Sequence, residues 1–408
     1  MKGEIKMKKV TITLAVVAIM ISTNLFAQIG RTYPDGHGGR VFFPFGDISF
    51  ADKIISYNSG NPSPQKEDKD PSNTLGIPNY NEEKDINFTS LGNGGSLVVK
   101  FTDNILYDID GIDLYIFEIG GDESFEVYIS KNGKNWIDVG KGAGTTKIDI
   151  KDFVKPTDIF RYVKLVDLKT DQGEWPGADI DAIGAIGSTL NFQLNGSVLF
   201  ETGKSTLNTD KTDLLKIAGE IKKTGGKVIV EGYTDNVGSP ESNLNLSKER
   251  AETVKKFFID SCKIDSSIII TNAYGEDNPT ADNNTPKGRQ KNRRVEIVLF
   301  PKTDNTGNVT GIWETNWGTL RIYKYGDIIA GWYTDDYGEI SGKLIDDHTI
   351  SGIWAENGSD RECEKDLYGR HHIGKVILKF NNDFSSFTTK WGYCSDEPTN
   401  TDWTGKRK

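Results

Sequence analysis

The sequence is poor in cysteine, methionine and positive charge, and each shortage excludes a class of protein. Three cysteines among 408 residues are too few to build a disulfide scaffold. Three methionines beside 44 glycines are typical of a strand- and turn-rich protein and not of a helical bundle. The 49 basic residues are outnumbered by 59 acidic ones, which leaves a net charge of −10. A protein that neutralises nucleic-acid phosphate carries the opposite sign, so we expect no nucleic-acid partner.

Motifs for catalysis and cofactor binding are also missing. The sequence contains no P-loop, no HExxH pair and no Ser/His/Asp set, and its histidines are His37, His348, His371 and His372. We therefore expect a non-catalytic protein without a cofactor. An acid-rich chain always offers pairs of carboxylates, so acid–base chemistry without a motif stays open at this point.

The chain has enough apolar residues to form several cores. Apolar residues make up 36% and charged residues 26% of the sequence, which excludes general disorder. At roughly 150 residues per domain, the length predicts two or three domains.

A long apolar run occurs only at the start of the chain. Four lysines within the first nine residues precede a mostly apolar stretch over residues 10–26, and the small residue Ala27 follows it. This order is typical of a secretory signal peptide, which we expect at residues 1–27. The stretch is shorter than the ~20 clean apolar residues that a membrane-spanning helix needs. No cysteine follows it, so we expect no lipid anchor there.

Residues 28–188 alternate short apolar strands with glycine, asparagine and aspartate, which predicts a β-sandwich. The clearest strands cover residues 96–101, 112–117, 125–130 and 161–166. Asn132-Gly133 follows the third strand, and Asn-Gly is the strongest short-range signal for a β-hairpin.

Three blocks of this region resemble the jelly-roll, galactose-binding-like modules of bacterial surface proteins. They are Gly94-Gly95-Ser96-Leu97, Val127-Tyr128-Ile129-Ser130 with Trp136, and Arg161-Tyr162-Val163 with Asp179-Ile180-Asp181-Ala182-Ile183. The resemblance implies a sugar-binding or spacer module, in some cases with structural calcium. Glu174, Asp179 and Asp181 are the candidate oxygen ligands for calcium. Alternating acids on the exposed face of a strand explain these residues equally well.

Residues 191–302 change to alternating strands and helices, which predicts an α/β layer. Apolar residues recur at three- and four-residue spacing over 214–221, as in an amphipathic helix. Ser247 is the expected N-cap of a second helix. Strands are expected at residues 198–200, 227–233, 268–270 and 295–299.

Several blocks of this region agree in order and spacing with one known family. The blocks are Gly232-Tyr233-Thr234-Asp235-Asn236, Asn243-Leu244-Asn245-Leu246-Ser247-Lys248-Glu249-Arg250-Ala251, Gly275-Glu276, and Asn292-Arg293-Arg294-Val295-Glu296-Ile297. They resemble the OmpA-like C-terminal domain, which binds peptidoglycan outside the membrane-embedded part of outer-membrane proteins. The resemblance covers about a quarter of the chain.

The resemblance implies that the ligand is the diaminopimelate side chain of the peptidoglycan stem peptide. Its free end carries an ammonium and a carboxylate on one carbon, so a binding site needs an acid and a base close together. Asp235 matches the family's acid, Arg250 matches its base, and Asn243 matches an asparagine near the site. A guanidinium binds a carboxylate through two parallel hydrogen bonds. With Arg250 in the first turn of the helix capped by Ser247, the helix N-terminus is expected to favour the same anion.

Two observations leave this interpretation of the residues open. An aspartate and an arginine also form simple ion pairs that tie a strand to a helix. Tyr233 stands where the family usually has histidine, and a tyrosine donates a hydrogen bond but does not become positively charged near neutral pH. Arg293 and Arg294 are expected to brace the end of the sheet.

Residues 308–408 contain a weak internal repeat of glycine and an aromatic residue. Gly311-Ile312-Trp313, Gly331-Trp332-Tyr333 and Gly352-Ile353-Trp354 recur at roughly 20-residue spacing. The repeat predicts a small antiparallel β-barrel or sandwich. Its tryptophans form either the core or a surface on which sugars stack.

The three cysteines have separate expected roles. Cys363 and Cys394 are expected to form a disulfide, which persists in an exported protein. The alternative is a metal site with His371 and His372, but adjacent residues on a strand point to opposite faces. Cys262 is expected to be a buried free thiol at the end of a helix.

Together these features predict an exported, non-catalytic cell-envelope protein of the periplasm or the cell outer membrane. Residues 191–302 would bind peptidoglycan, and the flanking β domains would contact outer-membrane proteins, other envelope proteins or glycans. The alternative is a surface carbohydrate-binding or adhesive protein in which the OmpA-like region is only a tether.

Overall fold

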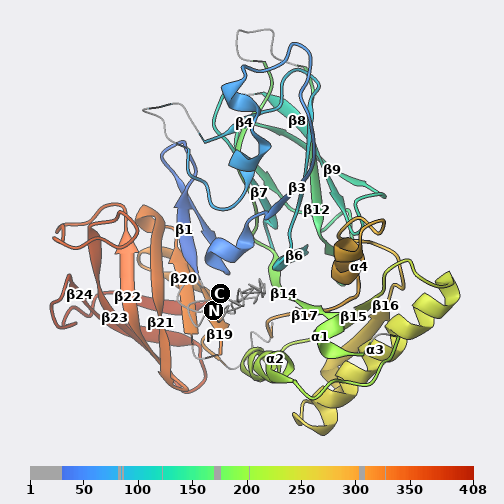
Figure 1. Cartoon of the computed structure of the whole chain (residues 1–408). Coiled ribbons are helices and arrows are strands. Elements are labelled where there is room, and N and C mark those ends of the chain that lie inside the picture. The colour runs from blue at the N-terminus through green and yellow to red at the C-terminus, as the bar shows by residue number, and fades with distance from the viewer. Residues whose placement is uncertain are drawn as a thin grey trace, which may run out of the picture.

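The structure is a computed structural model of the chain and describes residues 30–80, 84, 87–121, 123–169, 176–201, 203–302, 308–326 and 328–408. The expected signal peptide, residues 1–27, lies outside the described residues. Among the described helices, none has the length and apolar character needed to cross a membrane. A β-sandwich, an α/β layer and a closed barrel follow one another along the chain, so the predicted fold class is confirmed (Figure 1).

The first part is a sandwich of two antiparallel sheets. One sheet contains, in order, β3 (Lys53–Asn58), β5 (Ser96–Lys100), β12 (Tyr162–Asp167), β8 (Ser124–Ser130) and β9 (Ile137–Ala143). The other contains β10 (Thr146–Ile148), β7 (Leu114–Glu118), β13 (Asp179–Ala185) and β4 (Thr89–Ser90). Apolar side chains of both sheets meet in one core, which includes Val99, Ile116 and Val127. A separate hairpin, β1 (Arg31–Pro34) with β2 (Arg40–Phe43), precedes the sandwich.

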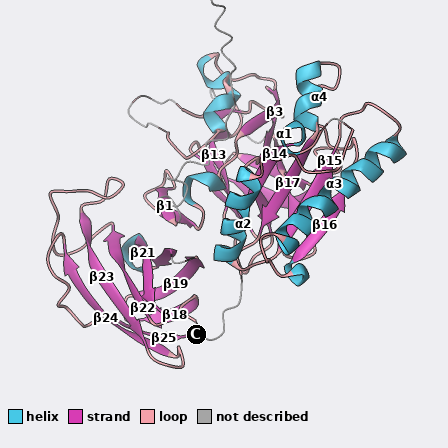
Figure 2. Cartoon of the chain, turned by 60° about the horizontal axis from the view of Figure 1, so that its bottom comes forward, coloured by secondary structure: helices cyan, strands magenta, loops and turns pink. Residues whose placement is uncertain are grey.

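The middle part is a mixed sheet with helices on one face. Its six strands follow the order β11 (Ile159–Phe160), β6 (Asn104–Tyr107), β14 (Ser188–Asn195), β17 (Arg294–Leu299), β15 (Val228–Tyr233) and β16 (Ile269–Ala273). Helices α2 (Thr212–Thr224) and α3 (Pro240–Asp260) pack on this sheet through an apolar core that includes Ile217, Val230 and Val254 (Figure 2). The short helix α4 (Pro286–Asn292) is capped by Thr285, whose hydroxyl oxygen accepts from the N–H of Gly288.

Two expectations for the middle part are wrong. Residues 196–199 form a short helix, α1 (Gly196–Leu199), and not a strand, because the side chain of Asn195 caps the backbone N–H of Ser197. Helix α3 is capped by Ser239 and begins at Pro240, two turns before the expected N-cap Ser247. Proline at the first helical position was the missed start signal.

The third part is a closed antiparallel barrel of eight strands. Its strands are β18 (Gly311–Thr315), β19 (Gly318–Tyr325), β20 (Ile328–Tyr333), β21 (Gly338–Asp346), β22 (Thr349–Glu356), β23 (His372–Phe380), β24 (Ser386–Tyr393) and β25 (Thr404–Arg407). Trp313, Trp354, Trp391 and Trp403 are buried in its core. The tryptophans of the repeat therefore fill the barrel, and only Trp317 and Trp332 are partly exposed.

The cysteines occupy two different environments. Cys363 and Cys394 are joined by a disulfide that links the β22–β23 connection to the end of β24, with their Cα atoms 5.5 Å apart. His371 and His372 contact backbone carbonyl oxygens of Cys363 and Arg361. Cys262 is buried and free just after α3, as the sequence predicts.

The middle sheet contains two strands, β6 and β11, from the region that also forms the sandwich. Its other four strands begin at or after residue 188. On the face opposite the helices, Ile105, Ile159, Ile229 and Val298 form a small apolar cluster. The first and middle parts are therefore joined by strand pairing and by an apolar contact.

A buried charge cluster lies beside this apolar contact. Glu231 and Glu296 lie directly opposite each other on β15 and β17, and both are fully buried. Arg161, from the first part, donates hydrogen bonds to Glu231 at 2.5 Å and to Glu296 at 3.0 Å. Arg294 donates a further one to Glu296 at 2.5 Å. Burial raises the pKa of Glu296, but Arg294, Arg161 and Lys100 outweigh burial and hold that pKa at about 2.

Replacing Arg161 by methionine removes the guanidinium and leaves a buried carboxylate without its partner. We expect Arg161→Met to lower the free energy of unfolding by about 3–5 kcal/mol, measured by urea denaturation at pH 7. Lys131→Met removes a cation whose ion pair with Asp158 is partly exposed, so its effect should stay below about 1 kcal/mol. Equal effects of the two substitutions would contradict the assigned role of Arg161.

Candidate functional site

The predicted binding residues lie in the loop after β15 and on α3. Strand β15 approaches α3 so closely at Gly232 that a Cβ atom there would lie 2.0 Å from the carbonyl oxygen of Ser247. The loop after β15 is fixed by the N–H of Thr234, which donates to Gly275 O at 2.7 Å. Ser247, inside α3, accepts from the N–H of Gly275 at 2.9 Å. Strand, helix and the β16 loop thus form one rigid frame.

Asp235 lies in this loop and is nearly buried. Its Oδ1 atom accepts from the N–H of Val237 at 3.1 Å, and its Oδ2 atom pairs with Arg293 Nη1 at 2.5 Å. Residues 236–240 on the outer side of the loop are exposed. The ion-pair partner of Asp235 is therefore Arg293, at the end of α4, and not Arg250.

Arg250 lies in the middle of α3 and is 2% exposed. Its Nε atom donates to Lys204 O at 3.0 Å, and its guanidinium lies over the ring of Phe200, 5.1 Å from the centroid. The Nη1 atom is buried and has no hydrogen-bond partner within the described part of the chain. Because α3 begins at Pro240, Arg250 is not in its first turn. The expectation that the helix N-terminus favours the same anion as Arg250 is therefore wrong.

Asp235, Arg250 and Arg293 interact electrostatically. Burial lowers the pKa of Arg250, Arg293 lowers it further, and Asp235 acts in the opposite direction. Two guanidinium groups therefore face one carboxylate, and the Arg250 guanidinium retains an unused donor. These three groups have one positive charge in excess, which suits a ligand group that carries a carboxylate.

Asn243 supports the loop next to this charge group. It is buried in α3, and its Nδ2 atom donates to Glu276 Oε2 at 2.6 Å. Asn292, at the end of α4, accepts from the N–H groups of Thr280 and Ala281 and holds the following loop. The sequence predicts Arg293 only as a brace of the sheet end and assigns no role to Glu276. Sequence spacing gives no signal for these pairings, because they join separate loops.

A comparison with known protein families identifies the region that contains this site. The OmpA family matches residues 199–293, which include Asp235, Asn243, Arg250 and Arg293. Residues 199–293 form an OmpA-like domain.

Curated relatives share the region of the OmpA-like domain. "Motility protein B" of Bacillus subtilis is 32% identical over 119 residues, which cover 28% of this chain and 46% of that protein. "Peptidoglycan-binding protein ArfA" of Mycobacterium tuberculosis is 38% identical over 114 residues, covering 28% and 35%. "Probable lipoprotein YiaD" of Escherichia coli is 35% identical over 119 residues, covering 28% and 53%. The chain thus spans about half the length of these relatives, or less.

Tyr233, the departure from the family pattern, faces away from the loop of the OmpA-like domain. It is 2% exposed, and its hydroxyl donates to Glu231 at 2.9 Å. Its ring stacks on Tyr274 and lies under Arg294, 3.7 Å from the guanidinium carbon. Tyr233 therefore belongs to the buried charge cluster between the first and middle parts.

The candidate calcium ligands are not shown to gather at one point. Glu174 lies outside the described residues, and Asp181 accepts from the N–H of Asn79 at 2.9 Å. Among the residues that the structure describes, the carboxylates close enough to share a metal ion belong to Asp108, Asp113 and Asp149. The two oxygens of Asp113 accept from the backbone N–H groups of Ile109 and Ile150, which explains its burial without a metal.

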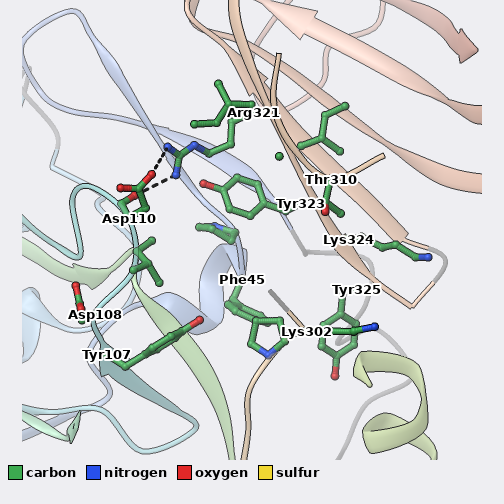
Figure 3. A pocket seen from close by; sticks show the side chains of 16 residues that line it. Phe45, Tyr107, Asp108, Asp110, Lys302, Thr310, Arg321, Tyr323, Lys324 and Tyr325 are labelled. Carbon is green, nitrogen blue, oxygen red and sulfur yellow. Dashed lines mark hydrogen bonds and ion pairs between the residues drawn. The ribbon is translucent and has the colours of Figure 1, made fainter. Parts of the chain in front are cut away.

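A hollow of about 290 Å³ lies at the junction of the barrel with the other two parts. Aromatic side chains line it, among them Phe45, Tyr107 and Tyr323, and Arg321 approaches Asp110 at its rim (Figure 3). Aromatic faces beside charged groups suit a sugar, so this hollow is the candidate site for the glycan-binding alternative.

A buried carboxylate in the sandwich makes stability depend on pH. Glu118 is fully buried, and its Oε2 atom has no partner among the described residues. Burial raises the pKa of Glu118 to about 8, and the nearby charge of Glu123 raises it as well. Hydrogen bonds from the N–H groups of Asp179 and Gly120 act in the opposite direction.

Because the pKa of Glu118 is raised in the folded state, its protonation stabilises the fold fully below the unfolded pKa of about 4.3. This stabilisation is lost as the pH rises towards 8. We therefore expect the free energy of unfolding to fall by a few kcal/mol between pH 5 and 8, and Glu118→Gln to flatten this slope. Urea titrations at several pH values measure the slope. The exposed substitution Glu364→Gln is the control, and an unchanged slope in Glu118→Gln would contradict the account.

Proposed function

We propose that this protein is a non-catalytic cell-envelope protein that binds peptidoglycan through its OmpA-like domain and ties envelope components to the cell wall. Asp235 binds the ammonium, and Arg250 binds the carboxylate, at the free end of diaminopimelate in the stem peptide. Asn243 positions the loop through Glu276. An exported location, in the periplasm or at the outer membrane, is part of the proposal.

The observation that carries the proposal is the unused Nη1 donor of Arg250 next to the Asp235–Arg293 ion pair. A buried donor without an acceptor costs free energy, so an acceptor supplied by a ligand stabilises the site. A ligand ammonium at Asp235 replaces part of its interaction with Arg293. A relative whose name includes peptidoglycan binding, ArfA, supports the same ligand class. Because Nη1 is buried, binding needs a local rearrangement that uncovers this donor.

The sandwich and the barrel are proposed to connect the wall-bound OmpA-like domain to outer-membrane proteins, other envelope proteins or glycans. The carbohydrate-binding alternative loses its tryptophan surface, because most of these tryptophans fill the barrel. Its remaining support is the aromatic hollow beside Arg321. Binding of glycans on an array, lost on Tyr323→Ala, would favour this second function.

Retention on peptidoglycan sacculi tests the proposed site. The full protein is used, since the sheet of the OmpA-like domain includes strands of the first part. We expect Asp235→Ala and Arg250→Met each to weaken retention at least 30-fold, because loss of one partner of a desolvated charge pair costs about 2–5 kcal/mol. Methionine keeps the contact of residue 250 with Phe200.

Lys248→Met is the matched control, because it removes one positive charge from an exposed position of the same helix. Free diaminopimelate is expected to release the bound protein, whereas pimelate, which lacks the ammonium groups, is not. Undiminished retention of folded Asp235→Ala and Arg250→Met would refute the site.

A further inference from the structure

A second polar pocket lies on the opposite face of the middle sheet from the Asp235 site. Its volume is about 190 Å³. Lys100, Lys131 and Arg161 of the first part line it together with Tyr233 and Arg294 of the middle part. It is smaller than the roughly 300–1,000 Å³ of pockets for drug-sized ligands, so it admits only a small molecule.

Lys100 is the unusual member of this pocket. The residue is 5% exposed. Its Nζ atom lies 5.2 Å from the ring centroid of Tyr162, and within the described part of the chain no carboxylate lies at ion-pair distance from it. A buried ammonium without a carboxylate at ion-pair distance is costly, so a ligand that supplies one gains binding free energy.

The other charges around the pocket are already paired. Glu231 and Glu296 bind Arg161 and Arg294, and Asp158 binds Lys131. Lys100 is therefore the cation left over among the four that line the pocket. The Nε atom of Arg161 is a second unused donor, because it is buried without a partner in the described chain.

We propose that this pocket binds a small oxyanion, a carboxylate or a phosphate, through the Lys100 ammonium and the Arg161 Nε–H group. The donors come from the first part of the chain, and Tyr233 and Arg294 of the middle part close the pocket. A bound anion thus strengthens the junction between the two parts. This site is separate from the proposed peptidoglycan site, and neither depends on the other.

The charges facing Lys100 agree with an anion site. Burial lowers the pKa of Lys100 to about 8, Arg294, Arg161 and Lys53 act in the same direction, and Glu296 acts against them. The ammonium is therefore mostly protonated at pH 7 and is available to bind an anion.

Thermal unfolding of the purified protein at pH 7 tests the proposal with phosphate, acetate and chloride at equal ionic strength. We expect phosphate or acetate to raise the Tm by about 2–5 °C above chloride once its concentration is roughly ten times Kd. Lys100→Met should abolish this increase. Lys53→Met is the matched control, because exposed Lys53 is the cross-strand neighbour of Lys100 and its loss should leave the increase in place.

An increase with phosphate alone identifies a phosphate site, and one with acetate alone identifies a carboxylate site. Titration calorimetry of the wild-type protein should show saturable binding of about one equivalent of the same anion, whether or not the variant folds. No saturable binding, or an equal Tm increase in folded Lys100→Met, overturns the proposal.

Discussion

The arrangement of the chain depends on two carboxylates that face each other in the middle sheet. Glu231 and Glu296 are opposite neighbours on β15 and β17, where like charges repel and neither reaches water. They are stable as carboxylates only if cations are brought to them. Arg294 is supplied by strand β17 of the middle part and Arg161 by the first part of the chain. The need to neutralise this pair therefore fixes the first part of the chain on the outer face of the sheet.

This constraint separates the two faces of the OmpA-like sheet. One face carries α2 and α3, and the loop that holds Asp235 connects β15 to α3. The other face is covered by the first part, whose Arg161 binds Glu231 and Glu296. Positions 233 and 235 are only two residues apart, yet they belong to different sites. A tyrosine at 233 suits the covered face, because its hydroxyl satisfies Glu231 and its ring lies beneath Arg294.

Local patterns predicted much of the fold, and contacts between distant segments were missed. Alternation over 125–130 and the Asn132-Gly133 turn predicted β8 and the hairpin to β9 correctly, because both depend on nearby residues. Helix α3 starts earlier than its apolar spacing predicts, because Ser239 caps it and Pro240 occupies its first position. The sharing of one sheet by β6 and β14 was not foreseeable from the sequence, since it joins residues about 85 positions apart.

The candidate site shows the same division. The family resemblance pointed to Asp235 and Arg250, and in the structure the charges of these two residues interact. Spacing alone did not show that Arg293 is the ion-pair partner of Asp235, because that contact depends on how α4 folds back against the loop. Burial of the Arg250 Nη1 donor is likewise a property of packing and not of sequence order.

The most direct measurement is an experimental structure of this protein with diaminopimelate bound. The account places the ligand carboxylate within hydrogen-bond distance of the Arg250 guanidinium, and the ligand ammonium against Asp235, with a lengthened Asp235–Arg293 contact. Ligand found elsewhere, with the Arg250 donor still unoccupied, would contradict it.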